Sequence, residues 1–199
     1  GLIQIAFIII TIIANRRGLN DAAAVGIVEK VISFLFLVPS SMLSSVSVLG
    51  AQNFGAGKPE RAVETLKYAI MIALGFGLTV AVVIQFAADP VVSLFTDNGT
   101  VIHSGGQYLR GYIWDCVFAG IHFSFSGYFC ACQKSGLSFL HNITAIVLVR
   151  VPGVYMMSRL FSDTLYPMGL ATAAGSLLSV IICVIAFTIL LKKERKNKV

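Results

Sequence analysis

The sequence predicts an all-α membrane protein with six transmembrane helices. Of its 199 residues 57% are hydrophobic, and the mean hydropathy is +0.86. Only 12% are charged, whereas soluble domains carry about 25%. The long apolar runs lack the period-two alternation of strands and are separated by short polar turns. The high hydrophobic content and the low charged content exclude an ordinary soluble enzyme, a disordered tail and a nucleic-acid-binding module. We therefore expect no nucleic-acid partner.

Six stretches approach the roughly 20 apolar residues that a spanning helix needs. The first is short and the chain begins with Gly1 rather than Met, so we expect a truncated span of a longer protein, not a signal peptide. The second contains Pro39 near its middle and is expected to tilt or kink. The stretches are residues 1–14, 22–50, 66–88, 107–132, 137–160 and 166–191.

Basic residues predict the orientation, because cytoplasmic loops carry an excess of Lys and Arg. One side of the predicted bundle collects the larger set, Lys58, Arg61, Lys67, Lys134 and the basic tail from Lys192. The other side collects Arg16, Arg17, Arg110 and Arg159. We therefore expect a cytoplasmic C-terminus in a bacterial inner membrane. We also expect an aromatic belt at the outer end of the fourth span, formed by Tyr108, Tyr112 and Trp114.

Small residues at helical spacing predict that the six spans pack into one bundle. Helices in lipid associate through small residues, because lipid provides no hydrophobic drive between them. The sixth span offers Ala171, Gly175 and Ser179 at four-residue steps, and the fourth offers Gly120 and Gly127. Within the apolar runs, each cysteine is expected to behave as a small hydrophobic side chain.

Ionisable residues inside the spans are the strongest functional signal. A charge at mid-bilayer costs about 2.5–3.5 kcal/mol on insertion scales, so such residues usually serve a function. At 1.5 Å per residue, Glu29 and Asp115 lie about 10–12 Å below the outer surface and Arg150 about 15 Å. We expect these three to share one polar cavity. Lys30 points about 100° away from Glu29, and we expect Glu29 to face inward.

A purely structural role remains open for each of these residues. Glu29 with Arg150, or Asp115 with Lys30, could form ion pairs that only fix the helix register. Asp115, His122 and Ser126 fall near one stripe of the fourth span. His122 and His141 could equally be hydrogen-bonded packing residues. We find no phosphate-binding loop and no metal-ligand spacing, and expect no metal site.

At the end of the second span, residues 47–62 read SVLGAQNFGAGKPERA, which closely resembles the signature of the multidrug and toxic compound extrusion (MATE) family of secondary transporters. Gln52 and Asn53 would cap a helix end, Gly55 and Gly57 would turn the chain, and Pro59 would begin the next helix. Weaker matches follow in order at residues 94–97, 125–129, 133–136 and 150–152.

The resemblance implies a twelve-helix transporter of two lobes, with this chain as the C-terminal six-helix lobe of a split or truncated sequence. It implies no enzyme activity and no cofactor, but export of drugs or organic cations driven by entry of H⁺ or Na⁺, in the lipid bilayer and with an N-terminal lobe as partner. Acids that often bind the coupling ion or substrate match Glu29 and Asp115, while Gln4 stands where the family often has Glu. His122 and Arg150 are further candidates.

A carboxylate in a low-dielectric cavity can take a proton from one side of the membrane and release it to the other. We therefore expect Glu29→Gln or Asp115→Asn to abolish drug resistance without loss of expression. Three other functions compete with this one. A related lipid-linked saccharide flippase would need several deep arginines to bind pyrophosphate, and only Arg150 lies deep. A membrane-embedded enzyme would use His122, Cys130 and Asp115, and a structural anchor would have no use for buried acids.

Overall fold

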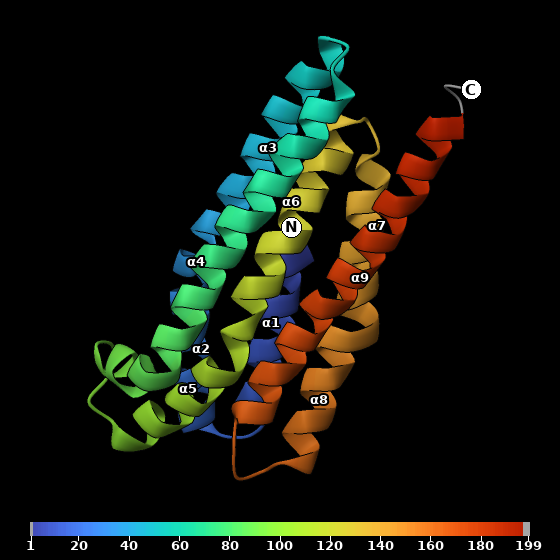
Figure 1. Cartoon of the computed structure of the whole chain (residues 1–199). Coiled ribbons are helices and arrows are strands. Elements are labelled where there is room, and N and C mark those ends of the chain that lie inside the picture. The colour runs from blue at the N-terminus through green and yellow to red at the C-terminus, as the bar shows by residue number, and fades with distance from the viewer. Residues whose placement is uncertain (1, 197–199) are drawn as a thin grey trace.

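The computed structural model describes the backbone of residues 2–196 and the side chains of residues 4–193. Every regular element within this range is helical, and the chain passes back and forth six times (Figure 1). The passes are α1 (Leu2–Asn15), α2 (Leu19–Leu35) with α3 (Leu37–Gly55), α4 (Pro59–Ser93), α5 (Gly99–Tyr112) with α6 (Trp114–Ala131), α7 (Ser135–Ala145) with the π-helix η1 (Ile146–Arg150) and α8 (Val151–Leu160), and α9 (Tyr166–Lys196).

The bundle has two ends, which are named here by a residue that lies at each. Turns 16–18, 94–98 and 161–165 lie at the Arg17 end, at the bottom of Figure 1. Turns 56–58 and 132–134 lie at the Lys58 end, at the top. Helix α4 begins at Pro59, seven residues before the predicted span, and α5 begins at Gly99, eight residues before its predicted span.

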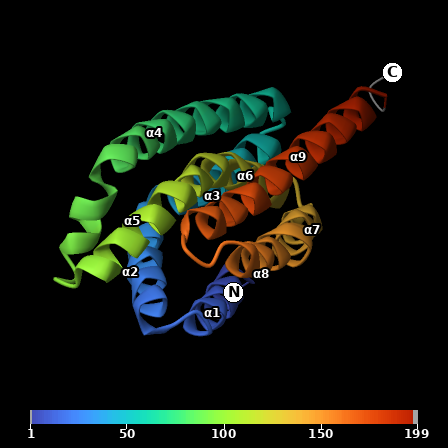
Figure 2. The same cartoon turned by 90° about the horizontal axis from the view of Figure 1, so that it is seen from below.

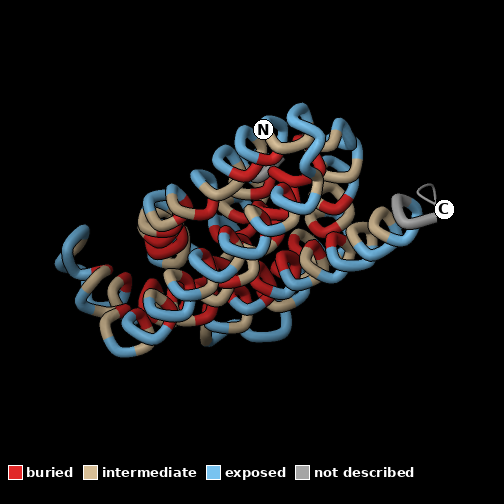
Figure 3. The backbone as a smooth tube through the Cα atoms, turned by 45° about the horizontal axis from the view of Figure 1, so that its top comes forward, coloured by how far each residue is buried: buried red, intermediate tan, exposed pale blue. Residues whose placement is uncertain are grey.

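Four of the passes are long and apolar enough to cross a membrane, and α1 is a shorter apolar helix. The pass made by α5 and α6 is not among the four, because α6 is the interior helix of the bundle. Fourteen of its 18 residues are buried, including Asp115 and His122. It lies between α3 and α4 on one side and α7 and α9 on the other (Figure 2), and the buried residues gather in the middle of the bundle (Figure 3). A helix that faces protein on all sides can carry polar residues that lipid would exclude.

Proline positions explain two irregular places. Pro39 cannot donate a backbone hydrogen bond. The second pass breaks at Phe36, one turn before Pro39, which confirms the predicted kink. Pro152 follows η1, whose wider turn lets the Val151 amide bond the Ile146 carbonyl, five residues back. Such π-helical turns are frequent at functional sites, and this one carries Arg150 at its last position.

Glycines let helices approach to backbone contact. A Cβ on Gly175 would lie 2.8 Å from the Cβ of Arg150, and one on Gly120 would lie 2.7 Å from the Cβ of Ala73. Gly127 faces α3 in the same way, so the predicted packing through small residues is confirmed. A second crossing, between Gly111 of α5 and Gly169 of α9, was not predicted. It brings α5 close to the charged residues.

The signature segment closes α3 with a Schellman turn. Gly57 has φ +70°, the Lys58 amide donates to the Asn53 carbonyl at 2.9 Å, and the Gly57 amide donates to Phe54 at 3.0 Å. The Gln52 and Asn53 cap is therefore made by backbone carbonyls, while the Asn53 side chain donates to its own helix at Leu49. Gly55 is the last residue of α3, and Pro59 begins α4 as predicted.

The predicted aromatic belt is wrong for two of its three members. Tyr108 and Tyr112 are both fully buried and pack edge to face at 5.4 Å between ring centroids. The glycine crossing of α5 and α9 draws this face of α5 into the bundle, so the rings meet protein rather than the membrane interface. Only Trp114 is partly exposed.

Candidate functional site

A buried ion pair links α6 to η1. The Arg150 guanidinium donates to Oδ2 of Asp115, and the same nitrogen lies 3.2 Å from Ser176 Oγ and 3.4 Å from the Thr172 carbonyl of α9. Asp115 is 0% exposed and Arg150 is 4% exposed. The π-helical turn and Gly175 together let the Arg150 backbone lie against α9, which aims the guanidinium at Asp115. Neither predicted alternative pair forms, because Asp115 takes the arginine.

Glu29 lies in the same cluster with a different partner. It is half-buried on α2, and its Oε2 lies 3.1 Å from the Thr11 hydroxyl of α1. Thr11 Oγ1 also lies 2.9 Å from the Phe7 carbonyl of its own helix. Within residues 4–193 Glu29 has no ion-pair partner, although the charge of Arg150 acts on it at longer range.

Several buried polar atoms around these charges have no hydrogen-bond partner among the described residues. They are Oε1 of Glu29, Oδ1 of Asp115 and the hydroxyl groups of Tyr108 and Tyr112. Both tyrosine hydroxyls lie within electrostatic range of Glu29, Asp115 and Arg150. Buried polar groups nearly always find a partner, and ordered water is the usual one where protein atoms leave such groups unpaired.

A second polar cluster lies nearer the Lys58 end. His141 Nε2 is 2.8 Å from Ser126 Oγ and its Nδ1 is 3.2 Å from Ser179 Oγ, so both ring nitrogens have partners. The His122 ring lies 5.5 Å from the His141 ring, and His122 Nδ1 has no partner among the described residues. The packing interpretation fits His141, whereas His122 has unused hydrogen-bonding capacity.

A small cavity of about 10 Å³ connects the two clusters. Its polar lining comes from both, with Arg150 and Ser176 from the first cluster, His122 and Ser179 from the second, and Asn142 of α7 beside them. That volume suits roughly one water molecule with two to four polar partners. Hydrogen bonds join Arg150 to Asp115 and Ser176, and His141 to Ser179, so polar groups of both clusters reach this cavity.

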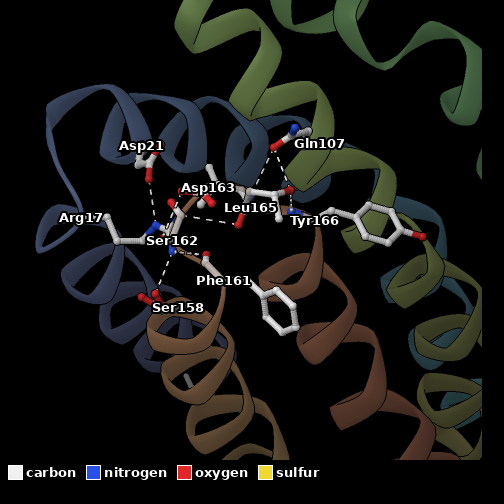
Figure 4. Close-up of polar contacts among 10 residues, drawn as sticks. Arg17, Asp21, Gln107, Ser158, Phe161, Ser162, Asp163, Leu165 and Tyr166 are labelled. Carbon is white, nitrogen blue, oxygen red and sulfur yellow. Dashed lines mark hydrogen bonds and ion pairs between the residues drawn. The ribbon is translucent and has the colours of Figure 1, made fainter.

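A third polar cluster fixes the Arg17 end (Figure 4). Arg17 pairs with Asp21 at 2.8 Å and donates to the carbonyls of Ser158, Phe161 and Ser162 at 2.7–2.8 Å. Gln107 Oε1 accepts from the Thr164 hydroxyl and the Leu165 amide, at 2.9 and 3.2 Å. These bonds tie the α1–α2 turn and α5 to the α8–α9 turn at this end of the bundle.

The predicted site residues thus fall into two groups. Glu29, Asp115 and Arg150 come together in one cluster, and His122 borders the cavity beside them. Gln4 is exposed and lies two turns, about 10 Å, before Thr11 on α1, so it is outside the cluster. Thr11, Tyr108 and Tyr112 were missed. The signal for the two tyrosines was the spacing of Tyr108, Tyr112 and Asp115, at steps of four and three along the fourth predicted span.

Spanning helices that bury charged side chains between them are typical of multi-pass membrane proteins of the transporter class. The MatE family model matches residues 2–156. The FAD transporter of Shewanella oneidensis is 28% identical over 135 residues, 67% of this chain and 29% of that protein. A probable multidrug resistance protein NorM of Halalkalibacterium halodurans is 23% identical over 198 residues, 98% of this chain and 40% of that protein.

Two solved structures share the fold. A crystal structure of MATE in complex with MaL6 has a TM-score of 0.89 at 18% identity, over 98% of this chain and 44% of that one. An inward-facing MATE transporter of the MOP superfamily has a TM-score of 0.86 at 17% identity, over 100% of this chain and 46% of that one. The chain belongs to the MatE family. It spans less than half the length of these relatives. The all-helical fold and the match to MATE structures confirm the predicted fold class. Family members are transporters, which excludes the enzyme alternative.

Proposed function

We propose that the chain is the C-terminal lobe of a cation-coupled antiporter. It exports drug-like organic compounds, organic cations among them, across the cell membrane by alternating access. Family membership and the NorM relative support an exporter of this kind. The observation that carries the coupling is Glu29, a half-buried carboxylate on a spanning helix with no basic partner in the described part of the chain. Such a residue has little structural value unless it binds an ion.

The Thr11 hydroxyl suits both protonation states of Glu29. When Glu29 is ionised, Thr11 donates to its Oε2 at 3.1 Å. When Glu29 is protonated, the acid donates to Thr11, whose own hydrogen then goes to the Phe7 carbonyl at 2.9 Å. A hydroxyl has one hydrogen and two lone pairs, so the exchange needs only a rotation of the hydroxyl. Loading and release of a proton then leave the Thr11 hydroxyl and Oε2 of Glu29 hydrogen-bonded in both states.

Of the two coupling ions, this geometry favours the proton. Arg150 already occupies one oxygen of Asp115 and acts electrostatically on Glu29. A fixed guanidinium repels a metal ion that enters the cluster, whereas a proton joins a carboxylate covalently and needs no further ligands. Asp115 then holds Arg150 in place, and Glu29 carries the proton. Buried in this pair, Arg150 does not face a substrate, which argues against a flippase that grips pyrophosphate.

The basic residues support an orientation with the Lys58 end and the C-terminus in the cytoplasm. Lys58, Lys67 and Lys134 are exposed near the Lys58 end and have no ion-pair partner among the described residues. At the opposite end, Arg17 and Arg110 are both paired with aspartates. Arg16 and Arg159 at that end have no ion pair among the described residues, but Lys and Arg are more numerous at the Lys58 end, and by the positive-inside rule that end is cytoplasmic. The compact turns suit a bacterial inner membrane.

The exposed faces indicate where the missing lobe packs. Between Tyr68 and Phe86 the exposed side chains of α4 are apolar apart from Thr79, and from Leu177 to Ile189 α9 exposes a similar apolar row. These faces suit lipid. The α2–α3 pass exposes apolar side chains too, but among them it also exposes Lys30, Ser33, Ser40, Ser41, Ser44 and Ser45. Polar side chains at that depth belong against protein or a water-filled chamber, so we place the N-terminal lobe and the transport path there.

The test uses the full-length transporter in proteoliposomes, with a pH gradient or a Na⁺ gradient imposed separately. We expect ethidium efflux to follow the pH gradient and to ignore Na⁺ at constant pH. Efflux that follows Na⁺ alone would contradict the proton assignment but keep the antiporter. Absence of efflux under both gradients, with correctly inserted protein, would contradict the exporter.

A further inference from the structure

Lys30 is an isolated positive charge on the exposed face of α2. It lies 11 residues into the helix, about 16 Å from its start, and is exposed. The three ion pairs of the described residues are Arg17–Asp21, Arg110–Asp89 and Arg150–Asp115, and none of them includes Lys30. A lysine facing lipid at this depth is costly, so this face meets either water or another polar group.

The acid next to Lys30 does not neutralise it. Glu29 lies about 100° around the helix, bonded to Thr11 of α1 on the bundle side. Asp115, the other acid of the cluster, is fully buried and bonded to Arg150. Both acids of this lobe's interior are thus turned away from the exposed face. The charge on this exposed face of the lobe is therefore the positive charge of Lys30.

An exposed aromatic ring and several exposed serine side chains lie on the same pass as Lys30. Phe34, one turn further along the same stripe, is 73% exposed. Ser33, Ser41 and Ser44 are exposed, and each hydroxyl donates to the carbonyl four residues back in its own helix. Their outward lone pairs can hold water but cannot hold an anion. Lys30 is therefore the one charged donor among the exposed residues from 29 to 55.

We propose that Lys30 and Phe34 form a substrate-binding element that takes a compound with an anionic group attached to an aromatic body. The ammonium holds the anionic group, and the exposed ring stacks on the aromatic part. The inference rests on the proposed function, and it adds to the drug-like substrates compounds that carry an anionic group, zwitterions included.

Equilibrium binding to the full-length protein in detergent tests the element without any gradient. Fluorescein and ethidium serve as probes, because both are planar aromatic compounds of similar size and opposite charge. We expect Lys30→Gln to weaken fluorescein binding at least tenfold and to leave ethidium binding unchanged or tighter. Lys30→Arg should keep fluorescein within threefold, and Phe34→Ala should weaken both probes. Lys67→Gln, which removes an exposed lysine near the Lys58 end, is the matched control and should change neither.

Two results would overturn the element. One is a fluorescein affinity that Lys30→Gln leaves within twofold of the parent. The other is loss of thermal stability in Lys30→Gln without a change in fluorescein affinity, which would identify an acid of the other lobe as the partner of Lys30. If Lys30→Gln cannot be purified, a salt titration of the parent protein replaces it, and fluorescein affinity that is independent of salt counts against the element. Because binding needs no gradient, failure of coupled transport leaves this test intact.

Discussion

Asp115 and Glu29 are two carboxylates in one cluster, but the molecule treats them differently. Asp115 is fully buried on α6 and bonded to Arg150, which is itself held by α9. Glu29 is half-buried on α2, and its one hydrogen-bond partner among the described residues is a hydroxyl. The first carboxylate has a fixed positive partner, whereas the second has a partner that tolerates either charge state.

The two carboxylates therefore suit different tasks, because Asp115 stabilises the structure and Glu29 can carry the coupling ion. A buried charge without its partner pays the desolvation penalty in full, so Asp115 and Arg150 depend on one another. Glu29 can change its charge without leaving a partner unsatisfied, which is what ion coupling requires. The expectation that both acids do the same task is therefore refined, and substitutions should affect stability at one and transport at the other.

The largest expected effect is that of Arg150→Met. It leaves Asp115 charged and unpaired in the bundle interior, which should lower the free energy of unfolding by about 3–5 kcal/mol. Unfolding of purified full-length protein in detergent measures the change. The control is Arg110→Met, which breaks the Arg110–Asp89 pair at 27% and 40% side-chain exposure and should cost about 1 kcal/mol or less. Equal losses of unfolding free energy in the two variants would contradict the structural role of the Asp115–Arg150 pair.

Removing both charges should restore most of this loss. In the double variant Asp115→Leu with Arg150→Met, no unpaired charge remains, and apolar side chains of similar size often replace a buried pair at little cost. We expect unfolding within about 1–2 kcal/mol of the parent. The matched control is Asp115→Asn, which strands Arg150 and should stay destabilised. A double variant as unstable as Arg150→Met would show that the pair acts through shape, not charge.

Glu29→Gln should affect transport and spare the fold. An amide cannot carry the proton, so pH-driven ethidium efflux should fall at least tenfold, about 1.4 kcal/mol in rate terms, with unfolding within about 1 kcal/mol of the parent. Glu64→Gln, at an exposed acid near the Lys58 end, is the control and should transport normally. Undiminished efflux by Glu29→Gln would leave the cluster without its proton carrier.

The smallest effect is expected at Thr11. Thr11→Val keeps the shape but removes the hydroxyl that serves both states of Glu29, which costs about 1 kcal/mol and should slow efflux severalfold. Thr11→Ser retains the hydroxyl and should behave like the parent. If valine and serine are indistinguishable in initial efflux rates, the hydroxyl has no part in coupling.

Much of the fold could be predicted from sequence, because it depends on local properties. Hydropathy located the six passes, Pro39 predicted the break near Phe36, and Gly120, Gly127 and Gly175 predicted close packing. The turn after Gly55 followed from glycine and proline chemistry. Helix ends were less accurate, since α4 begins seven residues before its predicted span. Hydropathy reports the part of a helix that suits lipid, not where its backbone bonds begin.

The sequence by itself determined that this is a membrane bundle with charges buried in its spans. Only the tertiary structure decided that Arg150 pairs with Asp115, and that Tyr108 and Tyr112 turn inward. The physical reason is rotation. Composition fixes which segments enter the membrane, but the direction of each side chain depends on how helices turn about their axes. Contacts far apart in the chain set that turn, here Gly111 against Gly169 and Gly175 against Arg150.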